Sequence, residues 1–144
     1  MNSGNHKSIV KILGTATTNG ATVTANIDTL NYDYVTIDVI LGTADVVSNK
    51  PSTLKLSECD TTVLTDFANV SGFVGGTDFT VANSDTSNEN VYRFNVDCKA
   101  RKRYLKLTVT PLTTQAIVLD ARLSRGVALP ISATNIGVAN LVEG

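Results

Sequence analysis

A chain of 144 residues is long enough to form one domain with its own apolar core. Charged residues make up 17% of the chain and its formal net charge is −1, so no overall field attracts nucleic acid or an anionic membrane surface. No apolar run approaches the roughly 18 residues that a membrane helix needs, and the polar start, Met1–Ser8, lacks the apolar centre of a secretory signal.

Apolar and polar residues alternate with a period of two through much of the chain, a pattern that predicts β-strands. The first run is short and ends at Gly14, and a loop of Thr, Asn and Gly follows it to Gly20. The clearest run is Tyr34–Leu41, in which every second residue is a large aliphatic one. The predicted strands are 8–13, 22–28, 34–41, 53–57, 91–98, 104–110 and 115–125.

Two stretches depart from this alternation. The segment Asp60–Asn90 is rich in Asp, Thr, Ser and Asn and is broken by three glycines, but it carries scattered apolar residues. We expect an irregular segment with one or two short strands that packs onto the domain. The turn Lys99–Arg103 lies between two strongly alternating segments and is expected to be the tip of a hairpin.

Seven or eight short strands separated by turn signals predict an all-β, antiparallel sandwich or barrel, and no segment predicts an amphipathic helix. The predicted organisation has three parts. These are a flexible N-terminal segment 1–7, a β-sandwich domain 8–125 and an extended C-terminal arm 126–144.

Residues for catalysis are sparse. The one histidine, His6, lies in the polar N-terminal segment, where nothing would orient it as a base. The candidate carboxylates, Glu58, Asp60, Asp97 and Asp120, fall in different strands and turns, as expected for solvated faces. The sequence therefore predicts a protein that is not an enzyme and has no metal site or cofactor.

The two cysteines, Cys59 and Cys98, do not form a CxxC pair, and one histidine cannot complete a zinc site with them. Buried free thiols are the simplest expectation, because free cysteine packs as a small apolar residue. A disulfide between them stays open as an alternative if their strands are neighbours.

The one cluster of positive charge is a candidate protein-interaction site. Its members are Lys99, Arg101, Lys102 and Arg103. Three interpretations compete: a solvated turn, contact with an acidic protein surface, and contact with nucleic acid. The last is the weakest, because one aromatic residue is adjacent and the rest of the chain is acidic.

The C-terminal arm is a second candidate contact element. It carries no charge until Glu143, whereas a disordered tail is usually polar or charged. We therefore expect the arm to lie against its own domain or a neighbouring subunit. The residues expected to make this contact are Val127, Leu129, Ile131, Ile136, Val138 and Leu141.

Short phrases of the chain resemble small virion proteins of tailed bacteriophages that are encoded near the major capsid protein. Some members of that group are jelly-roll cement, or decoration, proteins of the capsid. The phrases are Tyr32–Val39, Leu54–Glu58, the Phe67-x-x-Val70-x-Gly72 segment and Arg101–Lys106, within a resemblance that spans residues 8–125.

The resemblance implies a jelly-roll-like sandwich that binds the outside of a phage capsid and bridges or stabilises capsid subunits. The implied partners are the major capsid protein and further copies of the chain, as a homodimer or homotrimer, without nucleic acid or membrane. The implied location is the capsid surface of the virion, after synthesis in the cytoplasm of the host bacterium. The family contributes no catalytic residues.

Other functions remain open at this point. The chain is alternatively another phage structural protein, of the head–tail junction or the tail, or a β-sandwich module that binds carbohydrate or a host surface. Sugar binding needs exposed aromatic rings, for which Tyr32, Tyr34 and Tyr104 are the candidates. A cupin-like enzyme needs several histidines that this chain lacks.

Overall fold

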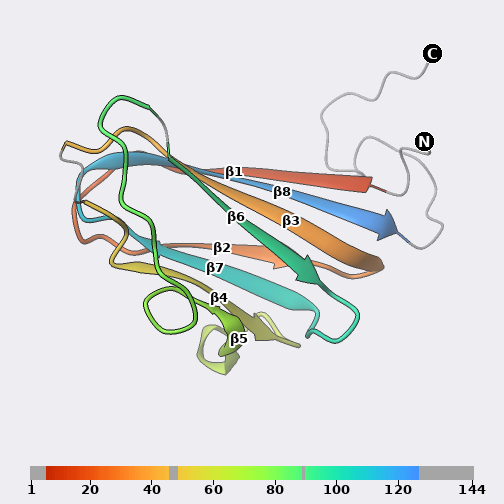
Figure 1. The fold of residues 1–144 in the computed structure, drawn as a ribbon. Coiled ribbons are helices and arrows are strands. Elements are labelled where there is room, and N and C mark those ends of the chain that lie inside the picture. The colour runs from red at the N-terminus through yellow and green to blue at the C-terminus, as the bar shows by residue number, and fades with distance from the viewer. Residues whose placement is uncertain (1–5, 46–48, 89, 127–144) are drawn as a thin grey trace, which may run out of the picture.

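The computed structural model describes residues 6–45, 49–88 and 90–126, which form two packed antiparallel sheets of four strands each (Figure 1). Sheet A has the strand order β1-β8-β3-β6, and sheet B has the order β2-β7-β4-β5. The strands are β1 (His6–Thr17), β2 (Val23–Asp28), β3 (Tyr32–Leu41), β4 (Thr53–Cys59), β5 (Ala68–Val74), β6 (Asn90–Asp97), β7 (Tyr104–Thr110) and β8 (Gln115–Gly126).

The strands pair in a nested order. β1 pairs with β8, β2 with β7, β3 with β6 and β4 with β5, so each pair encloses the next along the chain. This is the jelly-roll arrangement, in which a long folded-over hairpin is rolled into two sheets. The predicted all-β, jelly-roll-like sandwich is confirmed. In the described part of the chain, no helix has the length and apolar content of a membrane span.

The inner faces of both sheets form one apolar core, because alternate residues of each strand point toward the opposite sheet. Each large side chain buried there contributes about 1.5–3 kcal/mol relative to exposure. The largest fully buried side chains are Ile27, Val35, Ile37, Val39, Leu41, Leu54, Leu56, Leu105, Leu107, Ile117, Leu119 and Leu123.

The first strand is longer than its alternation predicts. β1 begins at His6, within the segment expected to be flexible, and continues to Thr17. It is extended because it pairs with the long strand β8, and two register shifts accommodate the irregular stretch around Gly14. Glycine is needed there because a Cβ atom would collide with the Thr17 side chain.

The prediction that Lys99–Arg103 is the tip of a hairpin is wrong. β6 lies in sheet A and β7 in sheet B, so the turn between them crosses from one layer to the other. Alternation identified both strands correctly, but it carries no information about which strands become neighbours. The ladders place β6 beside β3, and β7 between β2 and β4.

The long middle segment packs onto the domain, as predicted. It contains the short helical turn η2 (Leu64–Asp66) and strand β5, and then passes from sheet B to sheet A (Figure 1). Val70 and Val81 are buried, and the rings of Phe73 and Phe79 lie 6.1 and 5.9 Å from the ring of Phe94. These apolar contacts close the side of the sandwich between β5 and β6.

Both cysteines, Cys59 and Cys98, are buried and free, so the simplest expectation for them is confirmed. From residue 127 onward, the predicted C-terminal arm and its six apolar candidates lie outside the described residues.

Candidate protein interface

The turn Lys99–Arg103, here called the basic corner, is clamped to the end of β2. The Arg103 guanidinium donates two hydrogen bonds to the Asp28 carboxylate, at 2.9 and 2.8 Å. The backbone N–H and hydroxyl of Thr29 both donate to the Arg103 carbonyl, at 3.0 and 2.7 Å. The hydrogen bond from Arg103 holds the pKa of Asp28 below its ordinary value. Arg103 therefore has a fixed position on the surface.

Two acidic residues at the end of β4 hold the other side of the corner. Glu58 lies 3.7 Å from the Arg101 guanidinium and accepts a hydrogen bond from the Lys102 N–H at 3.2 Å. Asp60 accepts one from the Arg103 N–H at 3.4 Å. Glu58 and Asp60, expected to be solvated, thus meet the basic cluster because the two strands β4 and β7 are neighbours.

Lys99, at the start of the basic corner, contacts Tyr34 of β3. Lys99 donates a hydrogen bond to the Tyr34 hydroxyl at 2.8 Å, and its ammonium lies 4.8 Å from the centre of the same ring. The hydrogen bond raises the pKa of Lys99. Arg125, at the end of β8, also lies over this ring at 5.3 Å. The basic corner is therefore a surface of mixed charge and aromatic rings, and not an unpaired positive patch.

The tyrosines considered for sugar stacking are poorly placed for it. Tyr32 is buried, so the prediction that it offers an exposed ring is wrong. Tyr34 carries Lys99 and Arg125 over its ring, and Tyr104 carries the Arg103 guanidinium at 4.8 Å. A sugar would have to displace these cations before it could stack on either ring.

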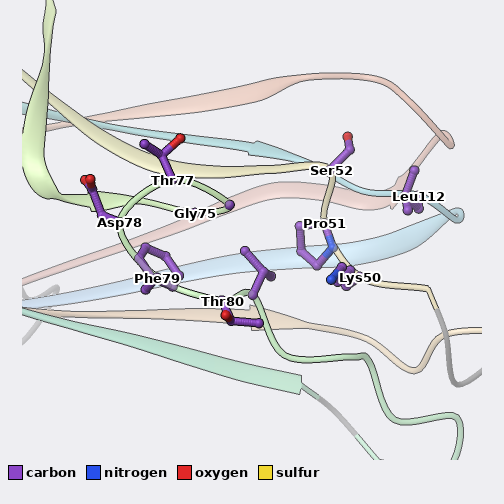
Figure 2. A pocket seen from close by; sticks show the side chains of 11 residues that line it. Lys50, Pro51, Ser52, Gly75, Thr77, Asp78, Phe79, Thr80 and Leu112 are labelled. Atoms are coloured by element: carbon purple, nitrogen blue, oxygen red, sulfur yellow. The ribbon is translucent and has the colours of Figure 1, made fainter.

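A hollow of about 460 Å³ opens where the start of β4 meets the loop after β5 (Figure 2). Pro51, Phe79 and Leu112 supply its apolar surface. The carboxylate of Asp78 accepts hydrogen bonds from the N–H groups of Gly72 and Val74, at 2.8 and 3.0 Å, so one of its oxygens holds the local turn. Within the described ranges, no three His, Cys, Asp or Glu side chains are grouped to hold a metal ion.

The outer face of sheet A carries an apolar row that alternation did not reveal. The strand register places Ile12 of β1 opposite Val118 of β8, Val118 opposite Ile40 of β3, and Ile40 opposite Val91 of β6. Ile12 is 70% exposed and Val91 57% exposed, while the two central residues are half-buried. These four residues are called the outer apolar row, and Val10, 62% exposed, lies beside it on β1.

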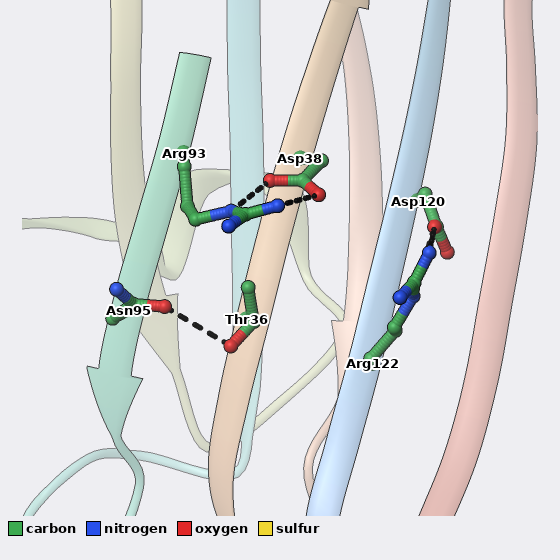
Figure 3. Close-up of polar contacts among 6 residues, drawn as sticks. All are labelled: Thr36, Asp38, Arg93, Asn95, Asp120 and Arg122. Carbon is green, nitrogen blue, oxygen red and sulfur yellow. Dashed lines mark hydrogen bonds and ion pairs between the residues drawn. The ribbon is translucent and has the colours of Figure 1, made fainter. Parts of the chain in front are cut away.

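The register places charged side chains, drawn in Figure 3, next to the apolar row. Arg93 donates two hydrogen bonds to Asp38, at 2.6 and 2.8 Å, and Arg122 donates to Asp120 at 2.8 Å. Asp38 and Asp120 lie opposite each other on neighbouring strands, so each arginine relieves the repulsion between two carboxylates. The hydrogen bonds from Arg93 lower the pKa of Asp38. The apolar row thus has a polar, ion-paired margin, a pattern typical of an interaction surface.

Comparisons with known proteins do not assign the chain to a family. No family model matches the sequence, and no curated protein matches it. Nine solved chains match in structure. One is a family GH115 4-O-methyl-α-glucuronidase with specificity for decorated arabinogalactans, at 15% sequence identity and a TM-score of 0.32. The match covers 78% of this chain and 14% of the glucuronidase chain. A likeness this distant carries no argument about activity.

Proposed function

We propose that this chain is a structural virion protein that binds the outside of a tailed-phage capsid and bridges neighbouring capsid subunits. The observation that carries the proposal is the basic corner, a fixed surface of arginine, lysine, tyrosine and carboxylate groups. The jelly-roll strand order supports it, because this architecture recurs in viral capsid domains. The sequence phrases that resemble capsid cement proteins lie in the same sandwich.

The basic corner has the composition of a protein contact. Arginine and tyrosine are enriched where protein interfaces bind most strongly. Because Arg103 and Lys99 are already held by Asp28 and Tyr34, a partner that docks here orders few additional side chains. Less conformational entropy is then lost on binding.

Weak contacts are sufficient for a protein of this kind. A decoration protein that associates with itself as a dimer or trimer meets several capsid subunits at once, and linked contacts bind more tightly than each one alone. We therefore include self-association in the proposal. Charge complementarity between the corner and a shell would also select the docking orientation.

Co-sedimentation tests the proposal. The probe is an expanded, empty shell assembled from the major capsid protein encoded in the same genome. The chain should pellet with the shells and saturate them, and its binding should weaken as salt increases. No pelleting at micromolar concentrations in low salt would overturn the proposal.

Three variants locate the contact. Arg101→Ser/Lys102→Ser/Arg103→Ser should lose most of its binding and most of its salt dependence. Lys102→Ser should weaken binding without disturbing Arg101 and Arg103, which are paired to other strands. Arg122→Ser is the matched control, because it removes one positive charge from an exposed position on sheet A. Equal binding by all three variants would exclude the corner as the contact.

A further inference from the structure

The outer apolar row is a continuous apolar surface that is exposed to solvent in the described part of the chain. Four apolar side chains cross all four strands of sheet A, and neighbouring strands are about 4.8 Å apart, so the row is roughly 15 Å long. Val10 widens it at the β1 edge. A continuous apolar row on an outward-facing sheet surface differs from the isolated exposed apolar residues that are normal on proteins.

A second copy of the chain is a poor cover for this row. The row and Val10 together expose less apolar area than the about 800 Å² that each partner buries in a stable interface. Edge-to-edge pairing of β1 with β1 of another copy is also disfavoured. It would gather Lys7 and Lys11 of both copies on one side of the joined strands, where like charges repel.

The sequence of residues 127–144 has the chemistry that the row requires. It has no Asp, Glu, Lys or Arg before Glu143, so it would bring no charged side chain onto the apolar row. Its apolar residues fall at alternate positions, first at Val127, Leu129 and Ile131 and then at Ile136 and Val138. Alternate apolar residues form one face of an extended segment.

The segment also starts in the right place and is long enough. It follows β8, which pairs with β1 from Ser124 opposite His6 to Val118 opposite Ile12. The row is therefore about 27 Å back along the sheet from Gly126, where β8 ends, at roughly 3.4 Å per residue. Eighteen residues span up to about 60 Å when extended, so about half of the segment reaches the row and the remainder can cross it.

We infer that residues 127–144 pack in cis over the outer apolar row of sheet A. The tether favours this arrangement, because a linked segment is present at an effective concentration in the millimolar range. The C-terminal residues of the same chain then cover the row and remove it from solvent. This inference does not depend on the proposed function, since it concerns contacts within one chain.

A double-mutant cycle in the full chain tests the inference. The segment variant is Ile136→Ser/Val138→Ser/Leu141→Ser, and the row variant is Ile12→Ser/Val91→Ser. The segment variant should lower the Tm by about 5 °C and raise the fluorescence of an apolar-surface dye several-fold. In the row-variant background, the same segment substitutions should change neither quantity, because the contact is already lost.

Val63→Ser/Leu112→Ser is the matched control background, since both residues are exposed and apolar but lie outside the row. The segment substitutions should keep their full effect in it. Equal effects of the segment variant in the row and control backgrounds would overturn the inference. A Tm effect that grows with protein concentration, together with a doubled molar mass in light scattering, would assign the cover to a second copy and would also overturn it.

Discussion

Leu107 lies at the centre of sheet B, and its truncation tests the arrangement of the core. It is fully buried on β7, opposite Ala25 of β2 on one side and Leu56 of β4 on the other. Leu107→Ala removes three carbons from the layer between the sheets. At about 0.8 kcal/mol per buried carbon, the lost transfer free energy is about 2.4 kcal/mol.

The cavity left behind adds to that cost, because the tightly held neighbours of Leu107 on both sides relax only in part. The expected loss in the free energy of unfolding is about 2.5–5 kcal/mol. For a domain whose total stability is about 5–15 kcal/mol, this is a large fraction. The Tm should fall by roughly 10–20 °C.

Urea unfolding followed by circular dichroism measures the change. Leu30→Ala is the matched control, because it removes the same three carbons from a side chain that is 50% exposed. Its cost should stay below about 1 kcal/mol. Equal costs for the two variants, with an unchanged urea dependence, would show that Leu107 does not lie between two packed sheets, and the register of β7 would then be wrong.

Three further predictions follow from the packing and the polar contacts. Burial raises the pKa of the Cys98 thiol to about 11. This thiol should therefore react with a thiol reagent at pH 8 only when the chain unfolds. Rapid labelling of the folded protein would contradict its burial. Because Arg93 holds the folded-state pKa of Asp38 below the unfolded value of 3.8, this contribution to stability is present above that pH and is lost as the pH falls through the folded-state pKa. The urea midpoint should therefore decrease below about pH 4 and decrease less in Asp38→Asn, and identical pH profiles for the two proteins would exclude the pair as a cause. Gly75→Ala should cost about 1–3 kcal/mol, because its Cβ atom would lie 2.8 Å from a backbone carbonyl oxygen of β4. Gly76→Ala should cost less, since its Cβ atom meets open space and only the positive φ of 82° is strained, and the reverse order in thermal melts would refute the packing around Gly75.

The local signal in the sequence predicted the strands well. The strand at 104–110 has the predicted bounds, and the one expected at 91–98 lies at Asn90–Asp97. β5 was not located within the long middle segment, because its exposed positions include Ala68 and Gly72 and its burial does not alternate. A period of two describes a strand with one solvated and one buried face, whereas in β5 only Val70 is fully buried.

Strand order was beyond the reach of the sequence pattern, and so was most of the candidate interface. The ion pair between Asp28 and Arg103 joins residues 75 positions apart, and it exists because the end of β2 lies beside the start of β7. The outer apolar row was missed for the same reason. Its residues occupy outward positions on four strands, so the row is visible only after the register of all four strands is known. The basic residues of the corner were identified, but their carboxylate partners were not.

The nested pairing of the strands also constrains how the chain folds. The paired strands β4 and β5 are close in sequence. By contrast, β1 pairs with β8, which follows it by about a hundred residues, so β1 forms its hydrogen bonds only after β8 is present. Closing such long loops costs entropy before any contact compensates for it, so we expect folding from the innermost pair outward, on the slow scale of milliseconds to seconds. During synthesis, the first half of the chain exposes apolar strand faces that have no partner strands. A chain that ends before β8 cannot form a smaller, complete sandwich. The ribosome must therefore deliver nearly the whole domain before sheet A can close, and until then the nascent strands are open to aggregation.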